Sequence, residues 1–256
     1  MVIGDIESEK LVQKNGKAIV QGVKERMFFD PLYMIVMIAG LALSGGAQLW
    51  VKSSTAKWDQ VPLRGGMTGR DIAQAILRAR GITDVSIEQV GGFLSDHYDP
   101  SQKVLRLSPG VYSGRSVTAA GIAAHEVGHA IQDADRYGLM AFRQTLVPVA
   151  NIGTQLGVWI VMLGAAMGAL GLAKIGVMLF GGFVLFTLIT LPVEIDASLR
   201  ARRLLLSNGI VTGEEAIGVT NVLTAAAATY LAAALSAILQ LLYFAMRAGL
   251  LGGRDD

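Results

Sequence analysis

The chain has no cysteine, and charged residues make up only 16% of its 256 residues. The absence of cysteine excludes disulfides, a thiol nucleophile and a metal site with thiolate ligands. Soluble domains carry about 25% charged residues. A charged fraction this low, with 52% hydrophobic residues and a mean hydropathy of +0.50, argues for an integral membrane protein. The net charge of +2 offers no electrostatic basis for binding nucleic acid.

The most prominent feature of the sequence is its long charge-free stretches. A membrane-spanning helix needs about 20 apolar residues, and we expect spans near residues 31–51, 155–173, 175–193 and 222–246. Lys174 separates the second expected span from the third. The first span does not resemble a cleaved signal peptide, because it contains several glycines and ends at Trp50 and Lys52, which are typical of an interfacial anchor.

The expected spans divide the chain into segments. We assign 1–26 to a polar N-terminal arm, 27–51 to the first transmembrane helix, 52–143 to a polar α+β region, 144–193 to the second and third transmembrane helices, 194–221 to a juxtamembrane helix, 222–247 to the fourth transmembrane helix and 248–256 to a C-terminal tail. The fold class predicted is therefore a mainly α integral membrane protein, with about four transmembrane helices and one small α+β region between spans 1 and 2.

The polar region 52–143 has recognisable local signals. Thr68 and Asp71 form a capping-box pattern, which predicts a helix over 69–80. Alternating apolar residues predict strands over 84–90, 93–98 and 103–108, and the Asp99-Pro100 turn joins the last two strands into a short antiparallel hairpin. An alanine-rich pattern predicts a further helix from Ser116 to about Asp133.

That last helix carries the strongest chemical signal, His125-Glu126-Val127-Gly128-His129. Residues four apart lie on one face of a helix, so both imidazoles can reach one ion, and zinc accepts neutral imidazoles well. Glu126 lies beside this face, where it can act as a general base toward a metal-bound water. Ionisable groups on an otherwise apolar helix are costly unless they are paired or bound to metal, which argues against a chance match. Gly128 lets another backbone approach the helix.

A catalytic zinc site has three protein ligands and one open position. Without cysteine, the third ligand is either His97 or a carboxylate, and Glu194 is the best carboxylate because it directly follows the third span. With four spans, the loops 52–143 and 194–221 emerge on the same side of the membrane, so Glu194 can meet the two histidines there. Asp196 is a weaker candidate, since on a helix it faces away from Glu194.

The chain resembles the YugP-type membrane zinc metallopeptidases from about Met27 to about Arg247. The resemblance rests on these stretches: Phe28-Phe29-Asp30-Pro31, Leu94 through Pro100, Leu105 through Ser108, Ala123 through Ile131, and Leu191-Pro192-Val193-Glu194. It implies a zincin-like, gluzincin-like region with Zn²⁺ as cofactor. The wider HtpX-type relatives carry Glu-x-x-x-Asp, in which the Glu binds zinc and the Asp supports a ligand histidine. Position 194 matches this Glu, but the residue four positions later is Ser198.

Two residues of the hairpin are further candidates. His97 is either a turn residue bonded to its neighbours, a group that stabilises the oxyanion or holds substrate, or a metal ligand. Tyr98 is a second candidate for the oxyanion, because a phenol can donate to developing negative charge. By analogy with other zincins, residues 103–108 are expected to hold an extended peptide by edge pairing.

Two functions are compatible with these patterns. One is a membrane-embedded zinc endopeptidase in which Glu126 activates water; its partners would be the lipid bilayer and a protein or peptide substrate. The alternative is a zinc-stabilised membrane scaffold or regulatory partner of other membrane proteins, without proteolysis. Transport is disfavoured, because the expected spans contain essentially no ionisable residues. We expect a multi-pass protein of the bacterial cytoplasmic membrane; lysine and arginine counts on its two faces nearly tie, and the HtpX resemblance favours a site facing the cytoplasm.

Overall fold

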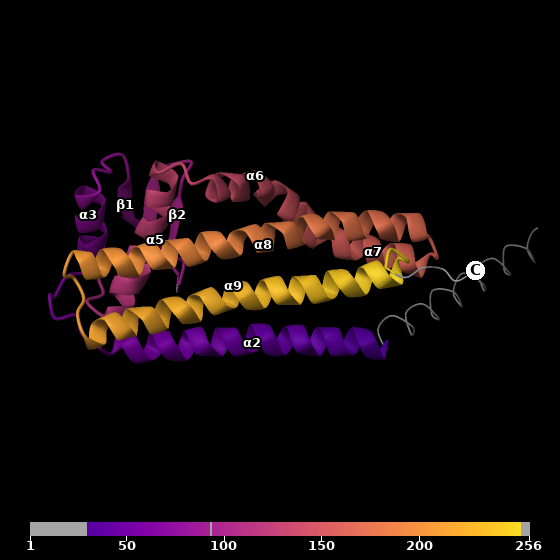
Figure 1. Ribbon diagram of the computed structural model, residues 1–256, viewed down its shortest axis with the longest axis horizontal. Helices are drawn as coiled ribbons and strands as arrows, with labels where there is room; N and C mark the ends of the chain where they lie inside the picture. Colours follow the sequence, from indigo (N-terminus) through magenta and orange to yellow (C-terminus); the bar gives the residue numbers. More distant parts are fainter. Residues whose placement is uncertain (1–29, 93, 252–256) are drawn as a thin grey trace, which may run out of the picture. The chain divides into compact units, whose positions relative to one another are not determined.

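The computed structural model describes residues 30–92 and 94–251, so the arm predicted over 1–26 lies outside the described residues. The elements run in the order α2 (Pro31–Asp59), α3 (Gly69–Ala79), β1 (Ser86–Gln89), β2 (His97–Asp99), β3 (Val104–Leu107), α4 (Pro109–Tyr112), α5 (Val117–Ala134), α6 (Gly138–Ile152), a π-helical turn η1 (Gly153–Gly157), α7 (Val158–Ala166), α8 (Leu170–Ser207) and α9 (Glu214–Arg247) (Figure 1). The described residues fall into two compact units, one of residues 30–43, 146–187 and 234–251 and one of residues 44–145 and 188–233.

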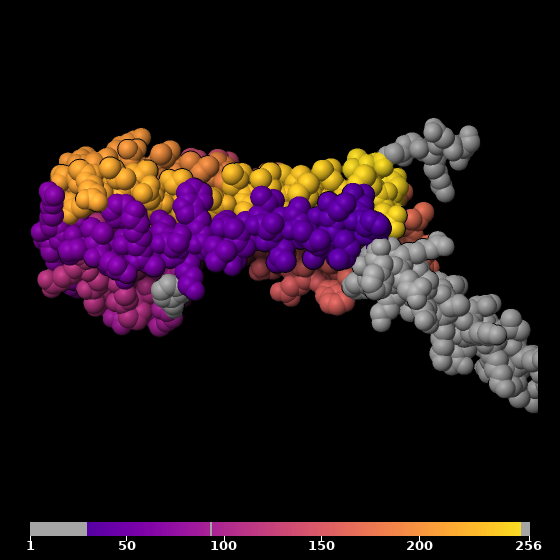
Figure 2. All heavy atoms as spheres, turned by 90° about the horizontal axis from the view of Figure 1, so that it is seen from below, coloured from indigo at the N-terminus to yellow at the C-terminus, as the bar shows by residue number. Residues whose placement is uncertain are grey.

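Four helical segments are long and apolar enough to cross a membrane: Pro31–Asp59, Gly138–Ala166, Leu170–Ser207 and Glu214–Arg247. Many of their large apolar side chains are exposed, among them Ile35 and Leu41 of α2 and Met178 of α8. Figure 2 shows α2, in indigo, at the surface. Such exposure is costly in water but not in lipid, where helices satisfy their own backbone hydrogen bonds. The four apolar helices expected from the sequence are confirmed.

The break between the second and third spans is not where the sequence suggested. Lys174 lies inside α8, and the chain turns instead at residues 167–169, where Gly168 has φ +65°. The amide of Ala169 donates to the carbonyl of Gly164, closing a Schellman-type helix end. One charged residue does not end an apolar helix, whereas a glycine in the left-handed region does.

Helix α8 also corrects the expected juxtamembrane segment. It continues without interruption from Leu170 to Ser207, with Pro192 inside it. Glu194 therefore lies within a long helix rather than at the start of a separate one. Helical turns on both sides of Glu194 fix the position of its backbone.

The unit of residues 44–145 and 188–233 contains the small sheet, whose strand order is β1-β3-β2. Strands β2 and β3 pair antiparallel, although β2 comprises only His97–Asp99 rather than the predicted range 93–98, and β1 pairs parallel to β3. The central position of β3 shows that one expectation is wrong: residues 103–108 cannot hold a peptide by edge pairing, because β3 already pairs on both sides.

Helices α3 and α5 cover this sheet and share its apolar core, to which Ile72, Leu105, Leu107 and Val127 contribute. The capping box predicted at the start of α3 is present, with Thr68 Oγ1 accepting from the Asp71 amide and the Asp71 carboxylate accepting from the Thr68 amide. These hydrogen bonds with Thr68, together with the nearby positive charges of Arg70 and Arg115, hold the pKa of Asp71 below its usual value. The core therefore anchors α5, the helix that carries the two histidines.

Candidate metal centre

Helix α5 holds the His-Glu-x-x-His segment in its second half. Ser116 caps the helix: its Oγ accepts a hydrogen bond from the Ala119 amide and donates one to Asp59. His125 and His129 lie one turn apart on a single face, with ring centroids separated by 4.8 Å. Helical geometry alone therefore brings the first two candidate ligands together.

Glu194 of helix α8 faces both rings. Its Oε2 atom lies 3.2 Å from Nε2 of His125 and 3.5 Å from Nε2 of His129, and its side chain is only 2% exposed. One ligand atom from each of the three residues lies within 4.8 Å of the other two, so together they could hold a metal ion. Two imidazole nitrogens and one carboxylate oxygen are a ligand set that zinc takes in catalytic sites, which shows that these residues fit zinc.

A buried glutamine orients the second histidine. Nδ1 of His129 donates to Oε1 of Gln132 at 2.9 Å, which leaves Nε2 to face Glu194. The Gln132 amide nitrogen in turn donates to the Val193 carbonyl and to the Asp196 carboxylate, both on α8. Asp196 thus acts through Gln132 and is not one of the three residues that face one another. Such outer hydrogen bonds fix the tautomer and the ring orientation of a ligand histidine.

Partners for the other two candidate ligands are also visible. Nδ1 of His125 lies 3.2 Å from Oγ of Ser198, the residue that stands where HtpX-type relatives carry aspartate. Oε1 of Glu194 lies 3.4 Å from a guanidinium nitrogen of Arg143, on α6. Arg143 therefore holds one carboxylate oxygen while the other faces the histidines.

Glu126 is mostly buried on α5 and lines a cavity of about 460 Å³ together with His125. This Glu126 cavity gives the candidate metal site an opening toward a reactant. Its wall includes Lys52 and Thr55 from α2, and Leu94 and Asp96 from the segment before β2. A carboxylate beside the metal face and open to a cavity is placed to move a proton to or from a bound reactant.

Sequence reasoning missed Tyr230, which lines the Glu126 cavity from helix α9. The charges of Glu194 and Glu126 both act on its phenol. Its signal in the sequence was a tyrosine two positions after the alanine run 225–228, inside an expected membrane span. A polar group in such a span is a functional candidate.

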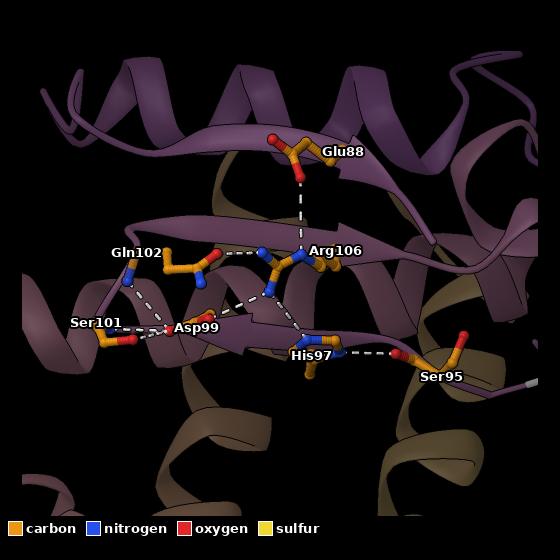
Figure 3. A network of polar contacts seen from close by, with 7 residues as sticks. All are labelled: Glu88, Ser95, His97, Asp99, Ser101, Gln102 and Arg106. Carbon is orange, nitrogen blue, oxygen red and sulfur yellow. Dashed lines mark hydrogen bonds and ion pairs between the residues drawn. The ribbon is translucent and has the colours of Figure 1, made fainter. Parts of the chain in front are cut away.

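The structure places His97 and Tyr98 on β2 with other partners. The His97 ring contacts the Ser95 carbonyl and Arg106, whose guanidinium also binds Asp99 and Glu88 and so connects all three strands (Figure 3). The hydroxyl of Ser101, the Gln102 amide and Arg106 hold the pKa of Asp99 down at about 2. Among the described residues, His97 does not belong to the group that could hold a metal.

Tyr98 is buried, and its hydroxyl donates to the Asp133 carboxylate at 2.7 Å. Burial and this hydrogen bond raise the pKa of Tyr98 well above its usual value. Lys103 binds the same carboxylate. The Tyr98 hydroxyl therefore links β2 to α5. The sequence analysis expected this hydroxyl to donate to an oxyanion, but here it donates to Asp133.

Comparison with known proteins adds a family relationship. A family model described as "Putative neutral zinc metallopeptidase" matches residues 33–249. The chain is 44% identical over 225 residues to the "Putative membrane protease YugP" of Bacillus subtilis (strain 168), an alignment that covers 88% of this chain and 99% of that protein. No solved structure matches the chain.

Proposed function

Since the chain belongs to the neutral zinc metallopeptidase family that matches residues 33–249, we propose that it is a membrane-embedded zinc endopeptidase of the gluzincin-like kind. The observation that carries this proposal is the convergence of His125, His129 and Glu194 within 4.8 Å, beside a glutamate that lines an open cavity. The relative named as a membrane protease and the four apolar helices support the membrane setting.

In this proposal each residue has one task. A bound zinc ion would supply Lewis-acid activation of water and of the scissile carbonyl. The Glu126 carboxylate accepts the proton of the attacking water and delivers it to the leaving amine nitrogen. The Tyr230 hydroxyl donates a hydrogen bond to the carbonyl oxygen as negative charge develops on it. Gln132, Ser198 and Arg143 keep the three ligand side chains in place.

The substitution Glu126→Gln tests the proposed mechanism. It removes the base but keeps the shape of the side chain, so we expect zinc to remain bound while the rate of peptide hydrolysis falls by about 10²- to 10⁴-fold. The measurement is cleavage of an unfolded protein substrate by the full chain in detergent, with and without chelator, beside zinc stoichiometry. Glu88→Gln, on the exposed strand β1, is the matched control and should retain full activity.

The same experiment separates the alternative function. A wild-type protein that binds zinc in a 1:1 ratio and cleaves nothing would instead be a zinc-stabilised scaffold. The cavity beside Glu126 favours the enzyme, because a structural zinc site needs neither a base nor an opening for a reactant. Hydrolysis by Glu126→Gln at the wild-type rate would exclude Glu126 as the base.

We further propose that the protein resides in a bacterial cytoplasmic membrane with the candidate site on the cytoplasmic side. The resemblance to HtpX-type relatives supports this orientation. Its partners would be the lipid bilayer and a protein or peptide substrate. Membrane proteins are the substrates we favour, because they share the bilayer with this protein.

A further inference from the structure

A second cavity, of about 300 Å³, adjoins the Glu126 cavity. We call it the Ala119 cavity; its apolar lining includes Ala56, Leu94, Val111, Ala119 and Ile122. The two cavities share four lining residues, Lys52, Thr55, Leu94 and Ile122. They therefore lie next to each other along α5, with the Glu126 cavity at the candidate metal centre and the Ala119 cavity toward the N-terminal end of the helix.

The distance between the two cavities can be measured along helix α5. Ile122 lies one turn before Glu126, and Ala119 lies about two turns before it. At a rise of 1.5 Å per residue, Ala119 is about 10 Å from Glu126 along the helix axis. An extended polypeptide advances about 3.3 Å per residue. A peptide bond held at Glu126 would thus place a side chain about three residues away over the Ala119 cavity.

Most polar groups around the Ala119 cavity are already bonded within the protein. Asp59 accepts from the Ser116 hydroxyl, the Ser108 hydroxyl donates to Asp96, and the Thr118 hydroxyl donates to the Thr55 carbonyl. Apart from Lys52, which lines both cavities, the remaining lining is largely apolar. Most of the surface that an entering polar side chain meets therefore offers no hydrogen bond in place of those lost to water. Moving an apolar side chain from water into this cavity would instead lower the free energy of binding.

We propose that the Ala119 cavity is a specificity subsite, which selects substrates with a large apolar side chain about three residues from the scissile bond. This inference rests on the proposed endopeptidase function and deepens it. Ala56 and Ala119 keep the subsite open because they are small, and Ile122 forms the boundary with the Glu126 cavity.

The test uses the full chain in detergent and a set of peptides that differ only in having leucine or alanine at one position two to four residues from the cleaved bond. We expect a preference for leucine of about 10- to 100-fold in kcat/KM at one of these positions. The variant Ala56→Phe fills the subsite from the exposed face of α2, so the preference should drop to near unity while the alanine peptide is still cleaved. Ala42→Phe, an exposed site on the same helix, is the matched control.

A second measurement does not depend on turnover. The Glu126→Gln variant should bind the leucine peptide about 10-fold or more tightly than the alanine peptide, and the double variant with Ala56→Phe should bind both equally. Chelator-sensitive cleavage without a preference at any of these positions, or a preference that survives Ala56→Phe, would overturn the subsite while leaving the endopeptidase intact. Wild-type protein that cleaves no peptide and binds both peptides equally would overturn both.

Discussion

Glu194 and His97, the two candidates for the third ligand, lie in different surroundings. Glu194 faces both histidines of α5, whereas the His97 ring contacts Ser95 and Arg106 on the sheet. We therefore expect Glu194→Ala to lose most of its bound zinc and His97→Ala to retain it. Metal analysis of the two purified variants makes the comparison. Loss of zinc from the His97 variant alone would transfer the third ligand position to His97.

Gln132 is fully buried and connects His129 to helix α8 through hydrogen bonds. Gln132→Leu keeps the approximate shape but removes these bonds, so the ring of His129 loses its fixed tautomer. We expect zinc affinity to fall by about 10- to 100-fold, measured by competition with a chelator. Gln89→Leu on the exposed end of β1 is the control. Unchanged zinc affinity in the Gln132 variant, with a folded protein, would remove Gln132 from the site.

The role proposed for Tyr230 can be separated by experiment from a purely positioning one. If its hydroxyl stabilises the developing oxyanion, Tyr230→Phe should lower kcat by about 10²- to 10³-fold and leave KM and bound zinc unchanged. If it mainly holds Glu194, the same variant should lose zinc first, which would contradict our proposal. Tyr33→Phe, which removes a hydroxyl from α2 in the other compact unit, serves as the control.

At the scale of elements, the site depends on the close approach of α5 and α8. A Cβ atom on Gly128 would lie 2.7 Å from the Ala197 carbonyl oxygen, whereas one on Gly121 of the same helix would meet nothing closer than 3.9 Å. The glycine predicted to admit a neighbouring backbone therefore does so, and the neighbour is the helix that carries Glu194.

These two glycines form a matched pair for mutation. Gly128→Ala should separate the helices, destabilise the protein by about 1–3 kcal/mol and weaken zinc binding. Gly121→Ala has room for its methyl group and should be neutral or stabilising by up to about 1 kcal/mol, because alanine favours helix. Thermal unfolding in detergent and a zinc titration measure both effects. Equal behaviour of the two variants would show that the contact at Ala197 does not govern the site.

At the scale of the whole molecule, all residues of the candidate centre and both cavities belong to the unit of residues 44–145 and 188–233. The other unit is built from helices joined by close glycine contacts, such as Gly176 against Val161, and by aromatic packing of Tyr33 on Tyr243. Small residues let membrane helices approach closely, where dispersion and weak polar contacts replace the hydrophobic effect. The candidate centre and both cavities are thus confined to one unit of the chain.

The orientation in the membrane can be tested directly, because the chain has no cysteine and a single introduced cysteine would be its one thiol. If each of the four apolar helical segments crosses the membrane once, Gln60, after α2, and Met167, between α7 and α8, lie on opposite sides. With the site in the cytoplasm, a membrane-impermeant maleimide should label Met167→Cys but not Gln60→Cys in intact cells. Inverted vesicles should give the reverse pattern. Labelling of Gln60→Cys in intact cells would place the candidate site outside.

The sequence by itself determined the features that depend on neighbours along the chain. Apolar runs predicted the four spanning helices, Thr68 and Asp71 predicted the cap of α3, and the spacing of His125 and His129 predicted their shared face. Each follows from the length, the ends or the 3.6-residue period of one helix. The placement of Glu194 beside them was predicted from the topology of the spans together with the family resemblance.

Only the tertiary structure decided which residues from distant segments contact one another. The parallel pairing of β1, the link through Gln132 to Asp196, the position of Tyr230 and the Ala119 cavity all bring together residues far apart in the chain. The same limit explains two wrong expectations, the break at Lys174 and the free edge at 103–108. The helix end was decided by the left-handed Gly168, and the edge by the pairing of β1 with β3. Such contacts depend on how side chains pack between elements, and no local period in the sequence encodes them.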